Sequence, residues 1–310
     1  MCRDEMVGVQ ANFDHCQIDN LRDHRHHCAM NAQNTIAAST IAPADFIAGM
    51  AKGMAVLESF DTERQRLNAT LAAQRAGITR AAARRHLLTL AHLGYLETDG
   101  SFYWLSSKVL RFSGNYLASA RLPRVLQPTL SRLAAQTGES FSAVVRDADE
   151  VVILARSNNT GQNNYQNQYK KESSLGNKYA GYTPYGLHLG ARLPMHATST
   201  GQVLLAQLTQ EDFAVWAQER GLPRLTAYTC TDLQQFAALI QQVRLQDYAV
   251  ASQMHELGVH ALAVPIRNAA GQTVAALNVV TQPAKLVVNE LQQGLLPLLQ
   301  DAARELRALV

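Results

Sequence analysis

Six arginines between Arg64 and His92 are the residues of this chain best suited to bind an anion. They stand at positions 64, 66, 75, 80, 84 and 85, and no aspartate or glutamate lies among them. Guanidinium groups bind phosphate and the O6 and N7 acceptors of guanine in the DNA major groove. Because 28 Lys+Arg against 25 Asp+Glu leave the whole chain at only +3, this local cluster indicates an anionic partner for one segment of the protein.

Two helices joined by a glycine turn are predicted to carry these arginines. Asn68 is a favoured N-cap for a helix that ends at Gly77, a residue type common just after helix C-termini. Thr79 then caps a helix over residues 80–92, which Gly94 closes. The arrangement is a helix-turn-helix.

The neighbouring segments complete the pattern. Asp45 is a predicted N-cap for an earlier helix, because apolar residues at helical spacing follow it. That stripe consists of Phe46, Ile47, Met50, Met54, Val56 and Leu57. Downstream, two β-prone runs at residues 95–98 and 101–105 enclose Asp99-Gly100, a dipeptide typical of tight hairpin turns. Helix, helix-turn-helix and hairpin in this order indicate a winged helix-turn-helix.

The helix over residues 80–92 is predicted to have an inner and an outer face. Ala83, Leu87, Leu90 and Gly94 share one face, which we expect to pack on the first helix. Small side chains beside arginines on the other face would allow the helix to enter the major groove. A solvated basic face is the alternative interpretation, and the helix-turn-helix context favours DNA. The predicted DNA-contacting residues are Thr70, Thr79, Arg80, Ala81, Ala82, Arg84 and Arg85. Thr70 is expected to contact a phosphate through its hydroxyl and the backbone N–H groups at the helix start.

The remaining chain predicts a linker and a second domain. An amphipathic helix over residues 109–122, ended by Pro123, is a natural linker. Beyond it, helices and antiparallel-prone strands alternate, which predicts the α+β fold class. The predicted helices cover residues 125–135, 195–208, 233–245 and 288–309, and the strands 141–145, 151–155, 262–266 and 273–281. Residues 158–177 are polar and predict a loop.

The domain organisation follows from these elements. Residues 1–44 are expected to be a disordered extension or a misassigned translation start, 45–106 the winged helix-turn-helix, 107–122 the linker helix, and 123–310 a second, ligand-sensing domain. No apolar window reaches the ~18–20 residues of a membrane span, and residues 1–5 lack the start of a signal peptide. The four cysteines form no disulfide framework. We therefore expect a cytoplasmic protein without a membrane partner.

The extension contains the residue types of a zinc site. His15-Cys16 and the run His24-Arg25-His26-His27-Cys28 could supply ligands. No second Cys-x-x-Cys or His-x-x-x-His pair completes a tetrahedral set, so neither a metal nor a cofactor is predicted.

Two other function classes, an enzyme and an architectural DNA binder, fit the sequence less well. An enzyme with an appended basic domain would need a catalytic motif, but the sequence has no Gly-x-Ser-x-Gly, no Gly-x-Gly-x-x-Gly opening a helix, no phosphate loop and no His-Glu-x-x-His. A purely architectural DNA binder would not need a second domain of this length. The favoured hypothesis is a regulator that is not an enzyme.

Two stretches resemble the IclR-type transcriptional regulators. They are residues 71–90, LAAQRAGITRAAARRHLLTL, and residues 192–206, RLPMHATSTGQVLLA. The resemblance covers about residues 45–310. It implies a winged helix-turn-helix joined by a linker helix to an effector-binding domain, a homodimer or tetramer, and double-stranded DNA with a near-palindromic operator as partner. Residues 46–53 and 110–117 are most similar to regulators of aromatic-acid catabolism that answer 4-hydroxybenzoate or protocatechuate.

The resemblance also implies an effector site. Its pocket positions fall at Ser199, Thr200, Ala251, Ala261, and Asn278 with Val280 or Thr281. Tyr185, His188, Arg192 and His196 are further candidates for a phenol contact or a counter-ion, although each is also explained as a surface or core residue. Relatives often carry acidic residues in the segment matching 251–253, which is uncharged here. The implied effector is a small aromatic carboxylate, 4-hydroxybenzoate before protocatechuate or another small carboxylate, and the implied protein is an activator of an aromatic-acid degradation operon.

Overall fold

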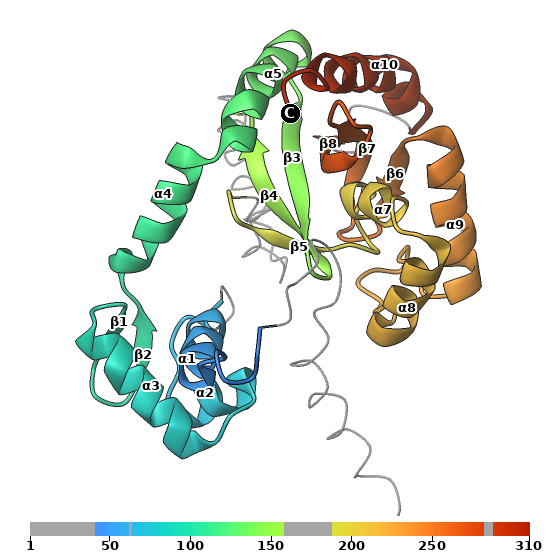
Figure 1. The fold of residues 1–310 in the computed structure, drawn as a ribbon. Helices are drawn as coiled ribbons and strands as arrows, with labels where there is room; N and C mark the ends of the chain where they lie inside the picture. The colour runs from blue at the N-terminus through green and yellow to red at the C-terminus, as the bar shows by residue number, and fades with distance from the viewer. Residues whose placement is uncertain (1–40, 62–63, 158–187, 282–287) are drawn as a thin grey trace, which may run out of the picture. The chain divides into compact units, whose positions relative to one another are not determined.

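The computed structural model describes residues 41–61, 64–157, 188–281 and 288–310 (Figure 1). The chain forms two compact units, Met1–Gly114 and Asn115–Val310. The histidines and cysteines of the predicted extension, at positions 15–16 and 24–28, and the predicted polar loop over 158–177 lie outside the described residues.

The first unit contains the predicted helix-turn-helix. Its helices are α1 (Ala48–Glu58), α2 (Ala69–Ala76) and α3 (Arg80–His92). The Asn68 side chain accepts hydrogen bonds from the backbone N–H groups of Thr70 and Leu71, and Gly77 takes a left-handed conformation with φ 64°. The Thr79 side chain caps α3 by accepting the N–H of Ala82 at 3.3 Å. The predicted caps of both helices are therefore confirmed.

A hairpin of β1 (Leu96–Thr98) and β2 (Tyr103–Leu105) follows α3 as expected. Gly100 adopts φ 95°, and the Asp99 carboxylate accepts the backbone N–H groups of Ser101 and Phe102 at 3.0 and 2.8 Å. A bridge between Leu67 and Tyr103 joins the hairpin to the segment before α2. The hairpin is the wing of the winged helix-turn-helix.

Ala83, Leu87 and Leu90 on the predicted inner face of α3 are buried, and the helix packs on both α1 and α2. Gly94, the fourth residue predicted for this face, is exposed because α3 ends at His92.

The predicted stripe on the first helix is wrong in its first half. Val56 is fully buried, but the apolar side chains before it are exposed, because none of the other described residues covers the beginning of α1. The exposed residues are Phe46, Ile47, Met50 and Met54. The N-cap position is Ile47 without a side-chain hydrogen bond, so Asp45 does not cap α1.

The predicted helix over residues 109–122 is shorter in the structure. A 3₁₀ turn (Ser107–Val109) leads into α4 (Leu110–Ser119), and the extended conformation of Ala120 separates it from α5 (Arg121–Thr137). Pro123 therefore lies in the first turn of a helix instead of ending one. A proline fits there because a first-turn N–H has no acceptor within the helix.

The second unit is built on a six-stranded antiparallel sheet, which confirms the α+β prediction. The strand order is β5-β4-β3-β8-β7-β6. The strands are β3 (Ser140–Asp147), β4 (Glu150–Arg156), β5 (Arg192–Pro194), β6 (Ala249–Ser252), β7 (His260–Arg267) and β8 (Thr273–Thr281). Two of them, β5 and β6, were not predicted, since three or four residues are too few to show a period of two.

Helices cover both faces of this sheet (Figure 1). One face packs against α5 and α10 (Val288–Leu306), and the other against α7 (Ser199–Leu205), α8 (Gln210–Arg220) and α9 (Leu233–Gln246). Helix α8 was not predicted. Helix α7 is shorter than the predicted span of 195–208, because Thr198 caps it by accepting the N–H of Gly201.

Alternation along β8 assigns its side chains to the two faces. Leu277 and Val279 belong to the core under α5 and α10, while Ala276 belongs to the core under α7, α8 and α9. Asn278 therefore faces the α7 side, and Thr281 faces the opposite side.

Candidate DNA interface and effector cavity

The outer face of α3 is open to solvent. Thr79, Arg80, Ala81, Arg84 and Arg85 are exposed, and Ala82 is half-buried. Among the described residues, no salt bridge joins Arg80, Arg84 or Arg85 to a carboxylate. Since these charges are not neutralised within the described part of the unit, this face can bind polyanions.

Other arginines of the cluster are used inside the unit. Arg66 pairs with Asp99, and its guanidinium lies 4.6 Å from the centre of the Trp104 ring. Arg75 pairs with Asp61, and its Nε donates to the Ser59 carbonyl at 2.6 Å. Both carboxylates come from outside the arginine-rich segment, which sequence spacing could not reveal. Pairing of Arg66 and Arg75 leaves the exposed arginines of α3, and Arg64 before α2, as the charges of the basic face.

Thr70 lies at the exposed start of α2, as predicted. Its backbone N–H and that of Leu71 already donate to the Asn68 side chain at 3.0 and 2.9 Å. The expectation that these N–H groups contact a phosphate is therefore wrong. The Thr70 hydroxyl is the group left for such a contact.

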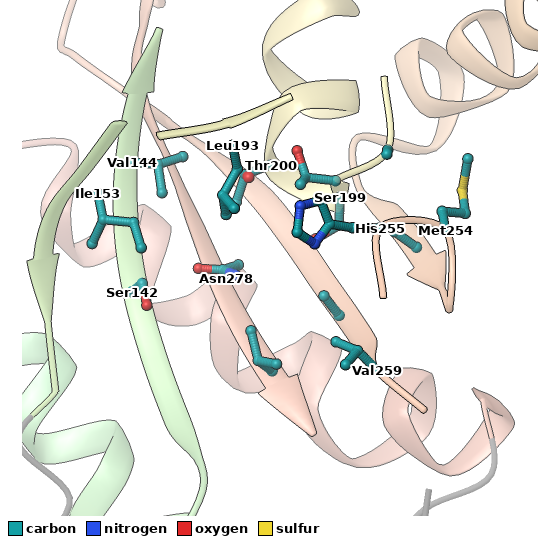
Figure 2. A pocket seen from close by; sticks show the side chains of 15 residues that line it. Ser142, Val144, Ile153, Leu193, Ser199, Thr200, Met254, His255, Val259 and Asn278 are labelled. Atoms are coloured by element: carbon teal, nitrogen blue, oxygen red, sulfur yellow. The ribbon is translucent and has the colours of Figure 1, made fainter. Parts of the chain in front are cut away.

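A cavity of about 60 Å³ lies between the sheet of the second unit and the start of α7 (Figure 2). By a measure in which one water needs about 10–15 Å³, it has room for several waters or one small ligand. Its apolar lining consists of Val144, Ile153, Leu193, Ala197, Ala251, Met254, Val259, Ala261 and Val280. Its polar lining consists of Ser142, Thr198, Ser199, Thr200, His255 and Asn278. None of these side chains is an aspartate, glutamate, lysine or arginine.

Strand register builds the floor of the cavity. Ser142 on β3 pairs directly with Asn278 on β8, so their side chains stand together on the same face. On the same face, Ala251 on β6 pairs with Ala261 on β7, which pairs with Val280. Two alanines in this row leave space beside larger neighbours. The small side chains of three different strands thus create the hollow.

Two buried polar atoms in the cavity have no hydrogen-bond partner among the described residues. They are Ser199 Oγ and Asn278 Oδ1, on side chains that are 1% and 8% exposed. An unpaired buried polar group costs about 1–3 kcal/mol. A ligand that supplies the missing partners removes this cost, so both atoms mark positions where a bound molecule would have polar groups.

His255 is the lining side chain that titrates closest to neutral pH. Burial lowers the pKa of His255, and the neighbouring His196 lowers it further. Burial also lowers the pKa of His196, against a hydrogen bond from its Nε2 to the Pro223 carbonyl at 3.0 Å. In the free protein, burial therefore favours the neutral form of both imidazoles.

The structure brings together six of the predicted effector residues, including Val280 as the alternative to Thr281, and separates the others. Ser199, Thr200, Ala251, Ala261, Asn278 and Val280 line the cavity. Thr281 does not, because strand alternation turns it to the opposite face of the sheet. Tyr185 lies outside the described residues.

The charged and imidazole candidates near α7 do not reach the cavity. Arg192 is exposed on β5 and pairs with Asp147 and Glu150, its Nε lying 2.7 Å from the Glu150 carboxylate. His188 is exposed, and His196 is buried without lining the cavity. In this structure Arg192, His188 and His196 therefore do not line the cavity predicted to hold the effector.

The most informative residue that was missed is His255. It lies in the loop between β6 and β7, and Met254 beside it also lines the cavity. Nothing in the local pattern of residues 253–259 marks these side chains as inward-facing. The positive φ of Gln253 (55°) turns the loop, and this conformation is not encoded by a glycine that sequence analysis could use.

The absence of a side chain at Gly201 allows the Met195 backbone, in the segment before α7, to lie against the first turn of that helix. A Cβ on Gly201 would lie 2.2 Å from the carbonyl oxygen of Met195 and 2.3 Å from its Cα. Glycine is therefore required for the contact that holds Ser199 and Thr200 over the sheet.

Other types of site are not found in the described part of the chain. No group of three or more His, Cys, Asp or Glu side chains there could hold a metal ion. None of the helices within the described ranges combines the length and the hydropathy needed to cross a bilayer.

Comparisons with known proteins agree with this architecture. The IclR helix-turn-helix domain matches residues 49–100, and the bacterial transcriptional regulator IclR C-terminal domain matches residues 184–308. The p-hydroxybenzoate hydroxylase transcriptional activator of Acinetobacter baylyi is 49% identical over 86% of this chain and 93% of its own length. The Pca operon regulatory protein of the same species is 48% identical over 85% and 89%.

A solved structure extends the similarity to the second unit. It is a double mutant of the inducer-binding domain of the PobR transcription factor from Acinetobacter, in complex with 3-hydroxybenzoic acid. It is 46% identical, covers 62% of this chain and all of its own, and superposes with a TM-score of 0.54. From both domain matches and these identities, the chain belongs to the IclR family of transcriptional regulators, with an N-terminal DNA-binding domain and a C-terminal effector-binding domain.

Proposed function

We propose that this regulator binds 4-hydroxybenzoate, or a close hydroxylated aromatic acid, in the cavity beneath α7, and activates an operon for its degradation. The observation that carries the proposal is a pair of buried atoms without hydrogen-bond partners among the described residues, Ser199 Oγ and Asn278 Oδ1, on side chains that line a cavity with no carboxylate, ammonium or guanidinium group. An aromatic ring with polar groups at its edge fits this lining better than an aliphatic or multiply charged molecule.

The two ends of the ligand have different partners in this proposal. The Ser199 and Thr200 hydroxyls donate hydrogen bonds to the carboxylate, and the Asn278 amide oxygen accepts the hydrogen of the phenol. The ring lies against the apolar side chains of Val144, Ile153 and Val280. The names of the two Acinetobacter baylyi relatives and the 3-hydroxybenzoic acid complex support the same ligand class.

The DNA-binding half of the proposal rests on α3. Arg80, Arg84 and Arg85 contact bases or phosphates, Ala81 and Ala82 allow close approach to the groove, and Thr79 and Thr70 contact the backbone. The exposure of this face and the absence of salt bridges to those three arginines within the described ranges support the assignment. Two copies of the chain, as a homodimer or within a tetramer, occupy the two halves of a near-palindromic operator.

The domain limits in this proposal are those expected from the sequence. Residues 45–106 bind DNA, 107–122 connect the domains, and 123–310 bind the effector. An effector changes transcription only if it binds one arrangement of the two DNA-binding domains better than another, so the connection through residues 107–122 transmits the signal.

Calorimetric titration of the purified full-length protein tests the ligand. We expect saturable binding of 4-hydroxybenzoate and much weaker binding of benzoate, because benzoate leaves the Asn278 amide oxygen without a partner. Protocatechuate has one further hydroxyl, and stronger binding of it would identify the regulator as a protocatechuate sensor. Glyoxylate, a small aliphatic acid, is the negative control. A folded protein that binds none of the three aromatic acids would contradict the proposal.

A further inference from the structure

We infer that effector binding takes up one proton from solvent and that His255 receives it, so that occupancy of the regulator depends on pH. The inference rests on the proposed function only in requiring that the effector carries a carboxylate. It concerns how a cavity lined by neutral groups accommodates a negative charge.

The position of His255 is the first step. Fifteen residues line the cavity, and among them His255 is the one whose side chain can become a cation near neutral pH. Figure 2 shows its imidazole ring pointing from the β6–β7 loop into the cavity. The other polar lining groups are hydroxyls and one amide, which cannot neutralise an anion.

The state of His255 in the free protein is the second step. Burial holds the pKa of His255 below its usual value, and so does the adjacent His196, from the segment between β5 and α7. In its own loop, burial raises the pKa of Glu256. Arg224, in the segment that contacts His196 through Pro223, is exposed and donates to Thr231 at 3.4 Å. Strands β3 and β8 and helix α7 contribute no charged side chain to the cavity.

The change on binding is the third step. A carboxylate within the cavity is a negative charge close to the half-buried imidazole, and it favours the imidazolium. The pKa of His255 therefore rises in the complex. At a pH between its values in the free and bound states, one proton moves from buffer to His255 for each effector bound.

The sign of the pH effect follows. Affinity for the effector increases as pH falls through the pKa of His255 in the complex, and it stops increasing below its pKa in the free protein. Where one full proton is taken up per effector bound, Kd falls about tenfold for each unit by which the pH falls. The regulator would thus need less effector in a more acidic cytosol.

The experiment is calorimetric titration of the full-length protein with 4-hydroxybenzoate at one pH, in two buffers with very different ionisation enthalpies. The difference in observed enthalpy gives the number of protons taken up. We expect up to one proton per site between about pH 6 and pH 8. The neutral analogue 4-hydroxybenzamide should bind without uptake, because it brings no negative charge.

Two variants assign the proton. His255→Gln keeps a polar side chain that does not titrate, and we expect its proton uptake to vanish and the pH dependence of its affinity to flatten. His188→Gln is the matched control in the same domain, since His188 is exposed and outside the cavity lining. Its uptake should equal that of the wild type.

Three outcomes would overturn the inference, and they differ from failure of the proposed function. Tight binding of 4-hydroxybenzoate without proton uptake would refute the inference while leaving the ligand assignment intact. Unchanged uptake in His255→Gln would place the proton on another group, including the effector itself. Absence of binding by any of the aromatic acids would remove the proposed function and the inference together.

Discussion

The outer face of α3 and the cavity beneath α7 offer opposite chemistry to a ligand. On α3, three arginines stand in solvent without salt bridges to other described residues. The described residues that line the cavity include no aspartate, glutamate, lysine or arginine, and two of their polar atoms are buried without partners in this part of the chain. The first surface attracts by charge and must weaken as salt rises. Under the proposed function the second selects by hydrogen-bond complementarity with neutral groups, which salt hardly affects.

The largest effect is expected from a substitution that disrupts the close contact between Gly201 and Met195 at the start of α7, which forms one wall of the cavity. Gly201→Ala places a methyl group 2.2 Å from the Met195 carbonyl oxygen, so α7 must shift away from the segment beneath it. We expect a loss of about 3 kcal/mol in the unfolding free energy of the second unit. Urea denaturation followed by Trp216 fluorescence measures it, since this tryptophan is buried beside α9.

Gly294→Ala is the matched control for that experiment. Gly294 lies within α10 of the same unit, and no atom is within 4 Å of the position of an added Cβ. Because alanine favours helix over glycine, this variant should be unchanged or up to about 1 kcal/mol more stable. Equal losses of unfolding free energy in both variants would show that the close approach of Gly201 to Met195 does not determine the position of α7.

The charged surface is tested by Arg85→Ala. Loss of a bidentate base contact should weaken operator binding by about 1–3 kcal/mol, while loss of a phosphate contact should weaken binding to all sequences and reduce the salt slope by about 1. Fluorescence anisotropy at several salt concentrations distinguishes the two. Arg304→Ala removes the same charge from α10, where Arg304 is 78% exposed and pairs with Asp301. If both variants lost the same amount of DNA affinity, α3 would contribute only its positive charge and no specific contact.

The neutral cavity is tested by Ser199→Ala. The Ser199 hydroxyl has no hydrogen-bond partner among the described residues, so its removal should leave the melting temperature unchanged or slightly higher. Affinity for 4-hydroxybenzoate should fall by about 1 kcal/mol, roughly fivefold in Kd. Differential scanning fluorimetry with and without the acid measures both quantities. Thr281→Val is the control, because it removes a similarly buried hydroxyl from the opposite face of the sheet, and that hydroxyl also has no partner within the described ranges. Thr281→Val should leave the affinity unchanged.

The two surfaces also differ in how far sequence could predict them. The caps Asn68 and Thr79 and the exposed arginines of α3 all lie within one short segment, where local periodicity determines which side chains face out. The family resemblance located Ser199 and Asn278, but no local pattern distinguished Val280 from Thr281 before the strand register was known. The sequence indicates Arg192 as a counter-ion for the effector, but in the fold Asp147 and Glu150 lie beside it and pair with its guanidinium. The inward position of His255 depends on the conformation of the β6–β7 loop, which no residue type in that loop predicts. Long-range pairing, which sequence periodicity does not encode, decided each of these cases.

The smallest expected effect lies in the wing, at the border of the charged surface. Hydrogen bonds from the Phe102 and Ser101 backbone N–H groups, with the nearby Arg66 charge, hold the pKa of Asp99 below its usual 3.8. A carboxyl whose pKa is lowered by folding stabilises the wing above its ordinary pKa, and this contribution disappears as pH falls through the lower, folded value. Trp104 reports on the wing because the Arg66 guanidinium lies over its ring, and Trp216→Phe removes the other tryptophan. Its fluorescence should be constant from pH 7 down to about 4 and change only below that. Asp99→Asn, whose amide oxygen still accepts both N–H groups but does not titrate, should abolish the transition. A transition centred above the ordinary carboxyl pKa would mean that Asp99 does not hold the turn, and that the wing is positioned by the stacking of Arg66 on Trp104 instead.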